Sequence, residues 1–160
     1  MGWKVDVHFK HSGIHGIGAF ASQRIAAGTR IWQVDPTMYF ADRRTLPRLA
    51  PADLRYALLA GYLHRPSGRF VWYEDGMQFM NHATGPGANV GLDYWPHRLF
   101  DDHLVAFRDI EPGEELFEDY GGCCLEGGLA PDHWMRPLYL AHAPQHYAFL
   151  LGLERLPMAA

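Results

Sequence analysis

Short stretches of alternating apolar and polar residues dominate the hydrophobic pattern of this 160-residue chain. Alternation over residues 3–9 (WKVDVHF) predicts a strand, because successive side chains along a strand face opposite sides of a sheet. Runs rich in apolar and aromatic residues, bounded by turn-forming residues, predict further short strands. These lie within residues 25–34, where a turn comes first, and at 69–75, 76–81 and 104–110. The pattern therefore favours a fold built from many short strands.

Helical spacing of apolar residues occurs in two places. Residues 51–64 (PADLRYALLAGYLH) begin with proline, which is favoured in the first turn of a helix, and carry apolar side chains at helical intervals. Residues 132–153 predict two helical pieces that are broken near Pro144. Strands and helices do not alternate regularly, so a parallel sheet of βαβ units is not expected. The predicted fold class is mixed β with some α.

The length and composition of the chain are those of one globular domain. A chain of this size buries roughly 70% of the surface that its unfolded form exposes. Hydrophobic residues make up 48% and charged residues 20% of the sequence. No apolar run approaches the ~20 residues of a membrane-spanning helix, and residues 1–13 lack the apolar core of a signal peptide. We therefore expect a cytoplasmic protein that does not associate with a membrane.

The charge balance argues against a general nucleic-acid-binding protein. The formal net charge is −4 at pH 7, whereas such proteins usually carry a basic patch. The two cysteines, Cys123 and Cys124, are adjacent. Neighbouring cysteines seldom pair with each other, and two thiolates cannot complete a tetrahedral zinc site. We expect both thiols to be reduced and no zinc to be bound.

The segment GIGAFA, residues 16–21, fits the glycine pattern of dinucleotide-binding folds. Asp35 lies nineteen positions after Gly16, close to where such a fold places the acid that binds ribose. A dinucleotide site also needs a long helix that opens at the glycines, yet residues 26–29 (AAGT) interrupt any helix there. The glycines are better explained by a tight turn or by close approach of the backbone to a ligand.

The positions of histidine, serine and cysteine match no known pattern of a metal-dependent or nucleophilic catalytic site. Ten histidines occur, but none is spaced as in a metalloprotease or a zinc deaminase. His142 and His146 are four residues apart, and Pro144 between them disrupts the shared helical face. No serine lies in a G-x-S-x-G motif. A nucleophilic Cys123 beside His82 has no local support.

Three segments carry more information together than any of them alone. They occur in this order: GIHGIGAFASQRIAAGTRI (13–31), FMNHATGPGANVGL (79–92) and AFRDIEPGEELFEDYG (106–121). This ordered set resembles a SET domain, the fold of many protein-lysine methyltransferases that use S-adenosylmethionine. The resemblance implies a single SET domain over residues 1–160, with short β-sheets around a pseudoknot-like core (3–121). It also implies a small helical insert near 43–64 and a helical C-terminal cap (122–160).

The resemblance assigns a cofactor site for S-adenosylmethionine, whose product is S-adenosylhomocysteine. Asn81 would use its amide and backbone on the amino-acid end of the cofactor, and an amide offers both a donor and an acceptor. Trp134 would stack on adenine or line the substrate channel, although a plain core tryptophan remains an equal alternative. The predicted cofactor-binding residues are Gly16, Ile17, Gly18, Asn81, His82 and Trp134.

The same resemblance makes Tyr120 the catalytic residue, with Phe117 and Glu118 in the substrate channel. The position of Glu118 is commonly aromatic in lysine methyltransferases, and a carboxylate there would favour the charged lysine. Glu118 therefore points away, recognises a cationic substrate, or indicates an unusual substrate. The usual asparagine after the Asn-His motif also comes two places late, at Asn89, which leaves its role open.

The implied reaction is methyl transfer to a lysine amine of a protein substrate. The acidic balance of the chain suits a substrate with a basic tail. Two alternatives remain open: a SET-like binding module with weak or no catalysis, and a methyltransferase acting on a small molecule or peptide. The chain is expected to be a monomer or a homodimer, with no direct binding of nucleic acid.

Overall fold

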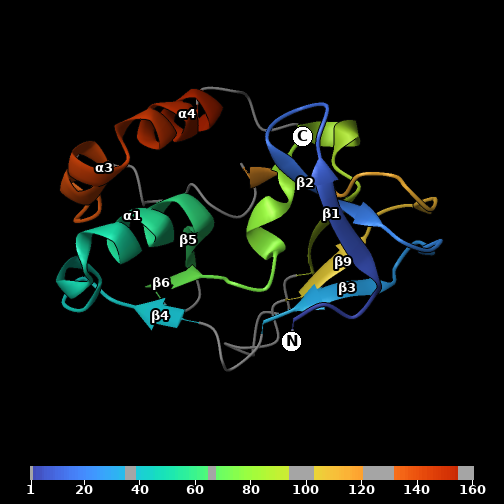
Figure 1. Cartoon of the computed structure of the whole chain (residues 1–160), viewed down its shortest axis with the longest axis horizontal. Helices are drawn as coiled ribbons and strands as arrows, with labels where there is room; N and C mark the ends of the chain where they lie inside the picture. The colour runs from blue at the N-terminus through green and yellow to red at the C-terminus, as the bar shows by residue number, and fades with distance from the viewer. Residues whose placement is uncertain (1, 35–38, 65–67, 94–102, 121–131, 155–160) are drawn as a thin grey trace. The chain divides into compact units, whose positions relative to one another are not determined.

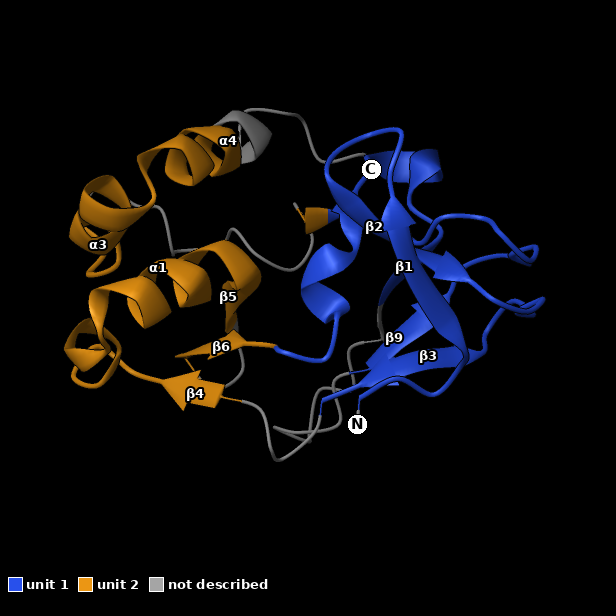
Figure 2. Ribbon diagram, viewed as in Figure 1, with its two compact units in different colours: residues 1–38, 74–119 blue, residues 39–73, 120–160 orange. Residues whose placement is uncertain are grey.

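The computed structural model describes residues 2–34, 39–64, 68–93, 103–120 and 132–154 (Figure 1). These residues form two compact units, each made from two separate stretches of the chain (Figure 2). Unit 1 comprises residues 1–38 and 74–119, and unit 2 comprises residues 39–73 and 120–160. Both units contain short sheets, and the α-helices of the described residues lie in unit 2, which confirms the predicted mixed-β fold class. The boundaries predicted for a single domain stay a prediction.

Unit 1 is built from two sheets. Strands β1 (Val7–His11) and β2 (Ile17–Ala21) form an antiparallel hairpin in which His8 lies opposite Phe20. The second sheet has five strands in the order β3, β9, β8, β10, β7. Their bounds are Arg30–Gln33, His103–Ala106, Val90–Asp93, Phe117–Glu118 and Asn81–His82.

Strand β10 occupies an unusual place in the five-stranded sheet. It pairs in parallel with β7 on one side and with β8 on the other, whereas the pairs β3–β9 and β8–β9 are antiparallel. β7 and β8 are joined by the loop 83–89, which contains the 3₁₀ turn η3 (Gly85–Gly87). Strand β10, which begins 24 positions after β8 ends, therefore lies between two strands that are joined by a short loop. This is the predicted pseudoknot-like crossing.

Three strand predictions in unit 1 need correction. The strand predicted at 104–110 is β9, which ends at Ala106. The first strand begins at Val7 and ends at His11, so it is shifted from the predicted 3–9; Trp3 only forms an isolated bridge with Trp32. Residues 77–79, predicted as part of a strand at 76–81, form the 3₁₀ turn η2 (Met77–Phe79). The apolar side chains of Met77 and Met80 are buried from this turn, so burial rather than strand alternation explains the run.

Unit 2 combines a three-stranded sheet with helices. The sheet order is β4 (Tyr39–Ala41), β6 (Arg69–Trp72), β5 (Gly61–His64), and all pairings are antiparallel. Between β4 and β5 lie the 3₁₀ turn η1 (Leu46–Arg48) and helix α1 (Pro51–Ala60). The helix predicted over 51–64 is thus ten residues long. Residues 61–64 leave it because they pair with β6 as a strand.

Two C-terminal helices complete unit 2. α3 (Arg136–His142) and α4 (Pro144–Glu154) confirm the predicted break near Pro144. Proline has no backbone N–H to donate and fits the first turn of a helix, so the second helix starts where the first has ended. In Figure 1, α1 lies between the α3–α4 pair and the β4–β6–β5 sheet, and it contacts both. None of the helices in the described ranges is long and apolar enough to span a membrane.

The core of unit 2 forms where these elements meet. Leu54, Ala57 and Leu58 face inward from α1 at helical spacing, and Phe70 and Trp72 cover them from β6. Met135, Tyr139, Ala143, Tyr147 and Leu150 close the same cluster from the C-terminal helices. The cap is therefore held by apolar packing within its own unit.

Candidate functional site

A glycine turn begins the candidate site in unit 1. Gly16 has φ +53°, a left-handed conformation that favours glycine, and it leads directly into β2. A Cβ at Gly16 would meet no atom within 4 Å, so a ligand has room to approach the main chain at this point. A Cβ at Gly18, in contrast, would collide with the Glu115 carboxylate. The two predicted glycines therefore serve different purposes.

The Asn81 side chain joins this turn to the centre of the unit. Its Nδ2 donates to Glu115 Oε1 at 2.8 Å, to the carbonyl oxygen of His15 at 3.1 Å and to that of Ile17 at 3.4 Å. All three groups are acceptors, so they orient the amide with its nitrogen toward the turn. The structure thus brings Asn81 together with the turn that contains Gly16, Ile17 and Gly18, and their role in cofactor binding stays a prediction.

Glu115 holds the same turn from the other side. The residue is only 9% exposed, and its Oε2 accepts a hydrogen bond from Ser12 Oγ at 3.0 Å. Ser12 Oγ in turn accepts from the backbone N–H of Ile14 at 2.9 Å. Glu115 itself forms an isolated bridge with Phe20 of β2. One buried carboxylate therefore connects the glycine turn, Asn81 and the segment that enters β10.

Asn89 has a structural role that its displaced sequence position left open. Its side chain is completely buried; Oδ1 accepts from the backbone N–H of Phe117 at 2.8 Å, and Nδ2 donates to the Glu115 carbonyl oxygen at 2.8 Å. The backbone of Asn89 also bonds to Phe117 and to Phe107. Asn89 therefore fixes the β10 segment against the loop through which it crosses.

His82 and the predicted channel residues lie along the β7–β10 pair. Phe117 is the register partner of Asn81, and Glu118 that of His82. The Nδ1 atom of His82 lies 3.3 Å from the carbonyl oxygen of Glu118. Glu118 is only 6% exposed, so its carboxylate does not belong to a solvated surface. The pairing places both predicted channel residues beside both residues of the Asn-His motif.

The acidic residues near β10 divide into two groups. Glu115 and Glu118 are buried, which contradicts a purely solvated acidic face for this segment. Glu114 instead forms an ion pair with Arg108, and the hydrogen bond from that guanidinium is the main cause of a lowered pKa for Glu114. Burial opposes this effect without reversing it. The exposed ion pair supports the turn that precedes the buried carboxylates.

Asp109 supports the same region from the opposite end of the 107–114 turn. It accepts a hydrogen bond from the backbone N–H of Ala27 at 2.8 Å and forms an ion pair with Arg24. The backbone hydrogen bond and the positive charge of Arg24 lower the pKa of Asp109. The bridge between Ile25 and Ile110 lies next to this contact. The Arg-Asp-Ile lead-in is therefore a structural connection rather than a ligand site.

The two remaining predicted site residues belong to unit 2. Tyr120 follows β10 by one intervening residue, Asp119, and is partly buried. Trp134 is partly buried too; it packs against the core cluster of unit 2, and its ring lies 5.6 Å from that of His133. These contacts are compatible with a core tryptophan, and its predicted contact with adenine stays a prediction. Cys123 and Cys124 lie outside the described residues.

Three aromatic residues of the C-terminal helices differ in their burial. Tyr139 and Tyr147 lie in the core of unit 2 with ring centroids 5.8 Å apart, whereas Phe149 is exposed. Within the described ranges, no group of three or more histidine, cysteine, aspartate or glutamate side chains is placed to hold a metal ion.

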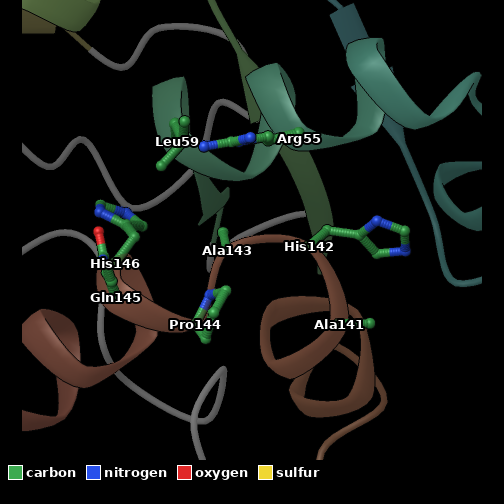
Figure 3. Close-up of a pocket in the computed structure, with 8 residues that line it drawn as sticks. All are labelled: Arg55, Leu59, Ala141, His142, Ala143, Pro144, Gln145 and His146. Atoms are coloured by element: carbon green, nitrogen blue, oxygen red, sulfur yellow. The ribbon is translucent and has the colours of Figure 1, made fainter.

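An open hollow of about 380 Å³ lies within unit 2 (Figure 3). Figure 3 shows the His142 ring pointing away from Arg55, while the His146 ring lies on the side toward which the guanidinium extends. Burial lowers the pKa of His146, so this ring is neutral near pH 7. Arg55 contributes its guanidinium to the wall. The residues that line the hollow are Arg55, Leu59, Ala141, His142, Ala143, Pro144, Gln145 and His146.

Sequence reasoning missed two residues of the candidate site, Ser12 and Glu115. Ser12 could not be recognised as a site residue from the sequence, because it lies in a predicted turn and belongs to no catalytic motif. Glu115 stood within the quoted Gly-Glu-Glu-Leu segment, but its neighbour Glu114 has the same side chain and a different environment. Only the register with β2 distinguishes the buried carboxylate from the exposed one.

The comparisons with known proteins agree with this geometry. The family model described as "SET domain" matches residues 16–121, which include the glycine turn, the Asn-His motif and β10. None of the curated proteins compared with the sequence matches it. The confirmed resemblance thus rests on the family model and on solved structures.

The solved structures with similar folds include methyltransferases. A humanized mutant of the Chaetomium thermophilum Polycomb Repressive Complex 2, bound to the inhibitor GSK126, is 24% identical with a TM-score of 0.58 over 82% of this chain and 16% of that chain. An active Polycomb repressive complex 2 in the basal state is 26% identical, with a TM-score of 0.57 over 73% and 15%.

The Neurospora SET domain protein DIM-5, a histone lysine methyltransferase, is 18% identical, with a TM-score of 0.54 over 74% of this chain and 53% of that chain. The present chain spans about one sixth of the length of the Polycomb chains that it matches. At these identities DIM-5 and the inhibitor-bound complex are similar in fold alone.

Proposed function

Because the chain belongs to the SET-domain family, we propose that it transfers a methyl group from S-adenosylmethionine to the amine of a lysine side chain in a protein. The observation that carries the proposal is the meeting of Asn81, the Gly16–Gly18 turn and β10 within one unit. Similarity in fold to DIM-5, described as a histone lysine methyltransferase, supports the same reaction class.

The residues around the glycine turn fit the polar end of this cofactor. Its amino-acid group needs fixed donors and acceptors, which the amide of Asn81 and nearby backbone groups offer. The open space at the Cβ position of Gly16 leaves the main chain accessible. Gly16, Ile17, Gly18, Asn81 and His82 would hold the cofactor, and Trp134 would contact its adenine.

The chain's contribution to the chemistry is alignment and control of protonation. When bound, S-adenosylmethionine supplies an electrophilic methyl group on a positively charged sulfur. A lysine amine with an ordinary pKa of about 10.4 must lose its proton before it attacks. An apolar wall that includes Phe117 would disfavour the ammonium form, and the Tyr120 hydroxyl oxygen would hold the amine and methyl group in line. S-adenosylhomocysteine is the product.

The substrate is proposed to be a protein with a basic segment around the target lysine. The chain has a formal net charge of −4, and complementary charge speeds and directs association. Glu118 is a buried carboxylate next to the Asn-His motif, and a cationic substrate group is a chemically suitable partner for it. The carboxylate would recognise the substrate rather than remove its proton.

The test combines cofactor binding with group transfer. Calorimetry with S-adenosylmethionine and S-adenosylhomocysteine measures binding, and incubation of a cell lysate with methyl-labelled cofactor measures transfer to proteins. We expect Tyr120→Phe to bind S-adenosylhomocysteine like wild type and to transfer methyl groups roughly a hundredfold more slowly. The matched control is Tyr39→Phe, since Tyr39 is an exposed tyrosine stacked on Trp72.

Each alternative function has its own outcome in this experiment. Cofactor binding without transfer to any lysate protein or metabolite would indicate a SET-like binding module. Label found by mass spectrometry in the small-molecule or peptide fraction alone would indicate a different substrate class. Absence of binding to both cofactor forms would overturn the proposal itself.

A further inference from the structure

Glu115 is a buried titratable residue to which neither the family resemblance nor the proposed reaction assigns a role. Its carboxylate accepts hydrogen bonds from Asn81 Nδ2 and Ser12 Oγ, at 2.8 and 3.0 Å. Buried carboxylates are costly unless they are fully hydrogen-bonded, so a role in the fold alone would already require these partners. The identity of one partner, Asn81, suggests a further role.

The surroundings of Asn81 determine which end of its amide faces a ligand. An amide nitrogen carries two protons, and three acceptors surround it: Glu115 Oε1 and the carbonyl oxygens of His15 and Ile17. A flipped amide would place its oxygen against all three acceptors, which is unfavourable. Among the described residues, no donor forms a hydrogen bond with Oδ1 of Asn81. This oxygen is therefore the part of the side chain left for a ligand.

The strongest of the three acceptors is the carboxylate. Hydrogen bonds to a charged acceptor are shorter and roughly twice as strong as neutral ones, and the bond to Glu115 is the shortest of the three. The hydrogen bond from Ser12 holds this carboxylate in place. Gly18 leaves room for it, since a Cβ at that position would collide with the carboxylate.

We propose that Glu115 is a positioning residue that orients the Asn81 amide so that Oδ1 accepts a hydrogen bond from the ammonium group of the cofactor's amino-acid end. This inference rests on the proposed function, because it assumes S-adenosylmethionine as the ligand. A carboxylate ligand would instead require the amide nitrogen, which is already engaged.

The first test needs no ligand. The sequence contains two asparagines and four glutamines, so the side-chain amide region of an NMR spectrum is simple enough to assign by substitution. We expect the amide protons of Asn81, identified by their loss in Asn81→Ala, to exchange with solvent much more slowly than those of exposed Gln23. In Glu115→Gln the Asn81 signals should shift but stay protected, because the glutamine oxygen still accepts.

The second test compares three ligands by calorimetry: S-adenosylhomocysteine, its deamino analogue and its decarboxy analogue. Loss of a hydrogen bond to a charged group predicts that wild type binds the deamino analogue roughly 10- to 100-fold more weakly. Glu115→Ala should bind S-adenosylhomocysteine more weakly and lose most of this preference. The affinity for the decarboxy analogue, relative to S-adenosylhomocysteine, should fall by the same factor in wild type and in Glu115→Ala. Glu115→Gln should retain the preference, as should the control Glu111→Gln at an exposed position.

The outcomes separate this inference from the proposed function. If wild type binds S-adenosylhomocysteine and Glu115→Ala retains the full preference over the deamino analogue, the positioning role is wrong and the function stands. If wild type binds no ligand, the proposed function and the ammonium contact both fail. The NMR comparison still decides then whether Glu115 orients Asn81. If Glu115→Ala does not fold, the NMR spectra alone decide. The proposal is overturned if the Asn81 amide protons of wild type exchange as fast as those of Gln23, or if the Asn81 signals do not shift in Glu115→Gln.

Discussion

Asn89 and Phe117 are joined by two reciprocal hydrogen bonds across the chain crossing. The backbone N–H of Phe117 donates to Asn89 Oδ1 at 2.8 Å, and the backbone N–H of Asn89 donates to the carbonyl oxygen of Phe117 at 3.1 Å. The first bond satisfies a backbone group of β10, and the asparagine itself is fully buried. The Asn89 side chain therefore adds to the strand pairing that fixes the crossing segment leading to Tyr120.

Asn89→Ala should lower the free energy of unfolding by about 2–4 kcal/mol, because it removes two hydrogen bonds and leaves buried backbone groups without partners. Urea unfolding followed by circular dichroism measures the change. Gln23→Ala, at an exposed position, is the control and should change stability by less than about 0.5 kcal/mol. Equal midpoints for Asn89→Ala and wild type would contradict the role of this side chain.

Gly18→Ala should destabilise the protein by about 1–3 kcal/mol, because its Cβ would collide with the Glu115 carboxylate. The displacement should also disturb the Asn81 amide, so affinity for S-adenosylhomocysteine should fall. Gly13→Ala is the matched control, since a Cβ there meets no atom within 4 Å. Thermal unfolding and calorimetry of the two variants check the prediction, which fails if both behave alike.

Acid should destabilise the protein through Glu114 and Asp109, whose pKa values in the folded state are lowered below the ordinary 4.5 and 3.8. For a carboxyl group with a lowered pKa, the stabilisation is complete above the ordinary pKa and is lost as the pH falls through the lowered value. The urea midpoint should therefore decline as the pH is reduced below about 4.5.

Arg108→Gln tests the cause of this acid dependence. The guanidinium of Arg108 is the first cause of the lowered pKa of Glu114, so its removal should return that pKa toward 4.5. Between pH 5 and pH 3 the free energy of unfolding should fall less in this variant than in wild type. The difference between the two proteins should be on the order of the contribution of Glu114 alone. Arg30→Gln, another exposed arginine, should keep the wild-type slope. Identical slopes for Arg108→Gln and wild type would refute the assignment.

The core of unit 2 offers a matched pair of neighbouring leucines. Leu58 is completely buried in the cluster, whereas Leu59 is 48% exposed on the same helix. Leu58→Ala should cost about 2–5 kcal/mol because it leaves a cavity among well-packed side chains. Leu59→Ala should cost well under half of that. Equal losses in urea unfolding would mean that α1 is not packed as described.

Several elements of the fold follow from local sequence. Proline at the start of α1 and α4, and inward side chains at helical spacing, sufficed to predict both helices and the break at Pro144. The order of three motifs sufficed to predict the family, and it also named Gly16, Gly18 and Asn81, which the structure brings together. These features depend on neighbours within a few residues or on recognisable residue identities.

Local reasoning failed where distant pairing controls the outcome. Residues 61–64 continue an apolar helical pattern, but hydrogen bonds with β6 turn them into a strand. Residues 77–79 form a 3₁₀ turn because Met77 and Met80 are buried from that conformation. In each case tertiary contacts outweigh an intrinsic preference that differs by less than about 1 kcal/mol per residue.

The sequence alone determined the family, the helical cap and the identity of the residues around the glycine turn. It did not distinguish Glu114 from Glu115, which are adjacent and chemically identical: one pairs with Arg108 at the surface, and the other is buried against Asn81. The bridge that buries Glu115 joins it to Phe20, 95 positions earlier in the chain. The environment of a side chain depends on such distant partners, and therefore its role is set only when the chain has folded.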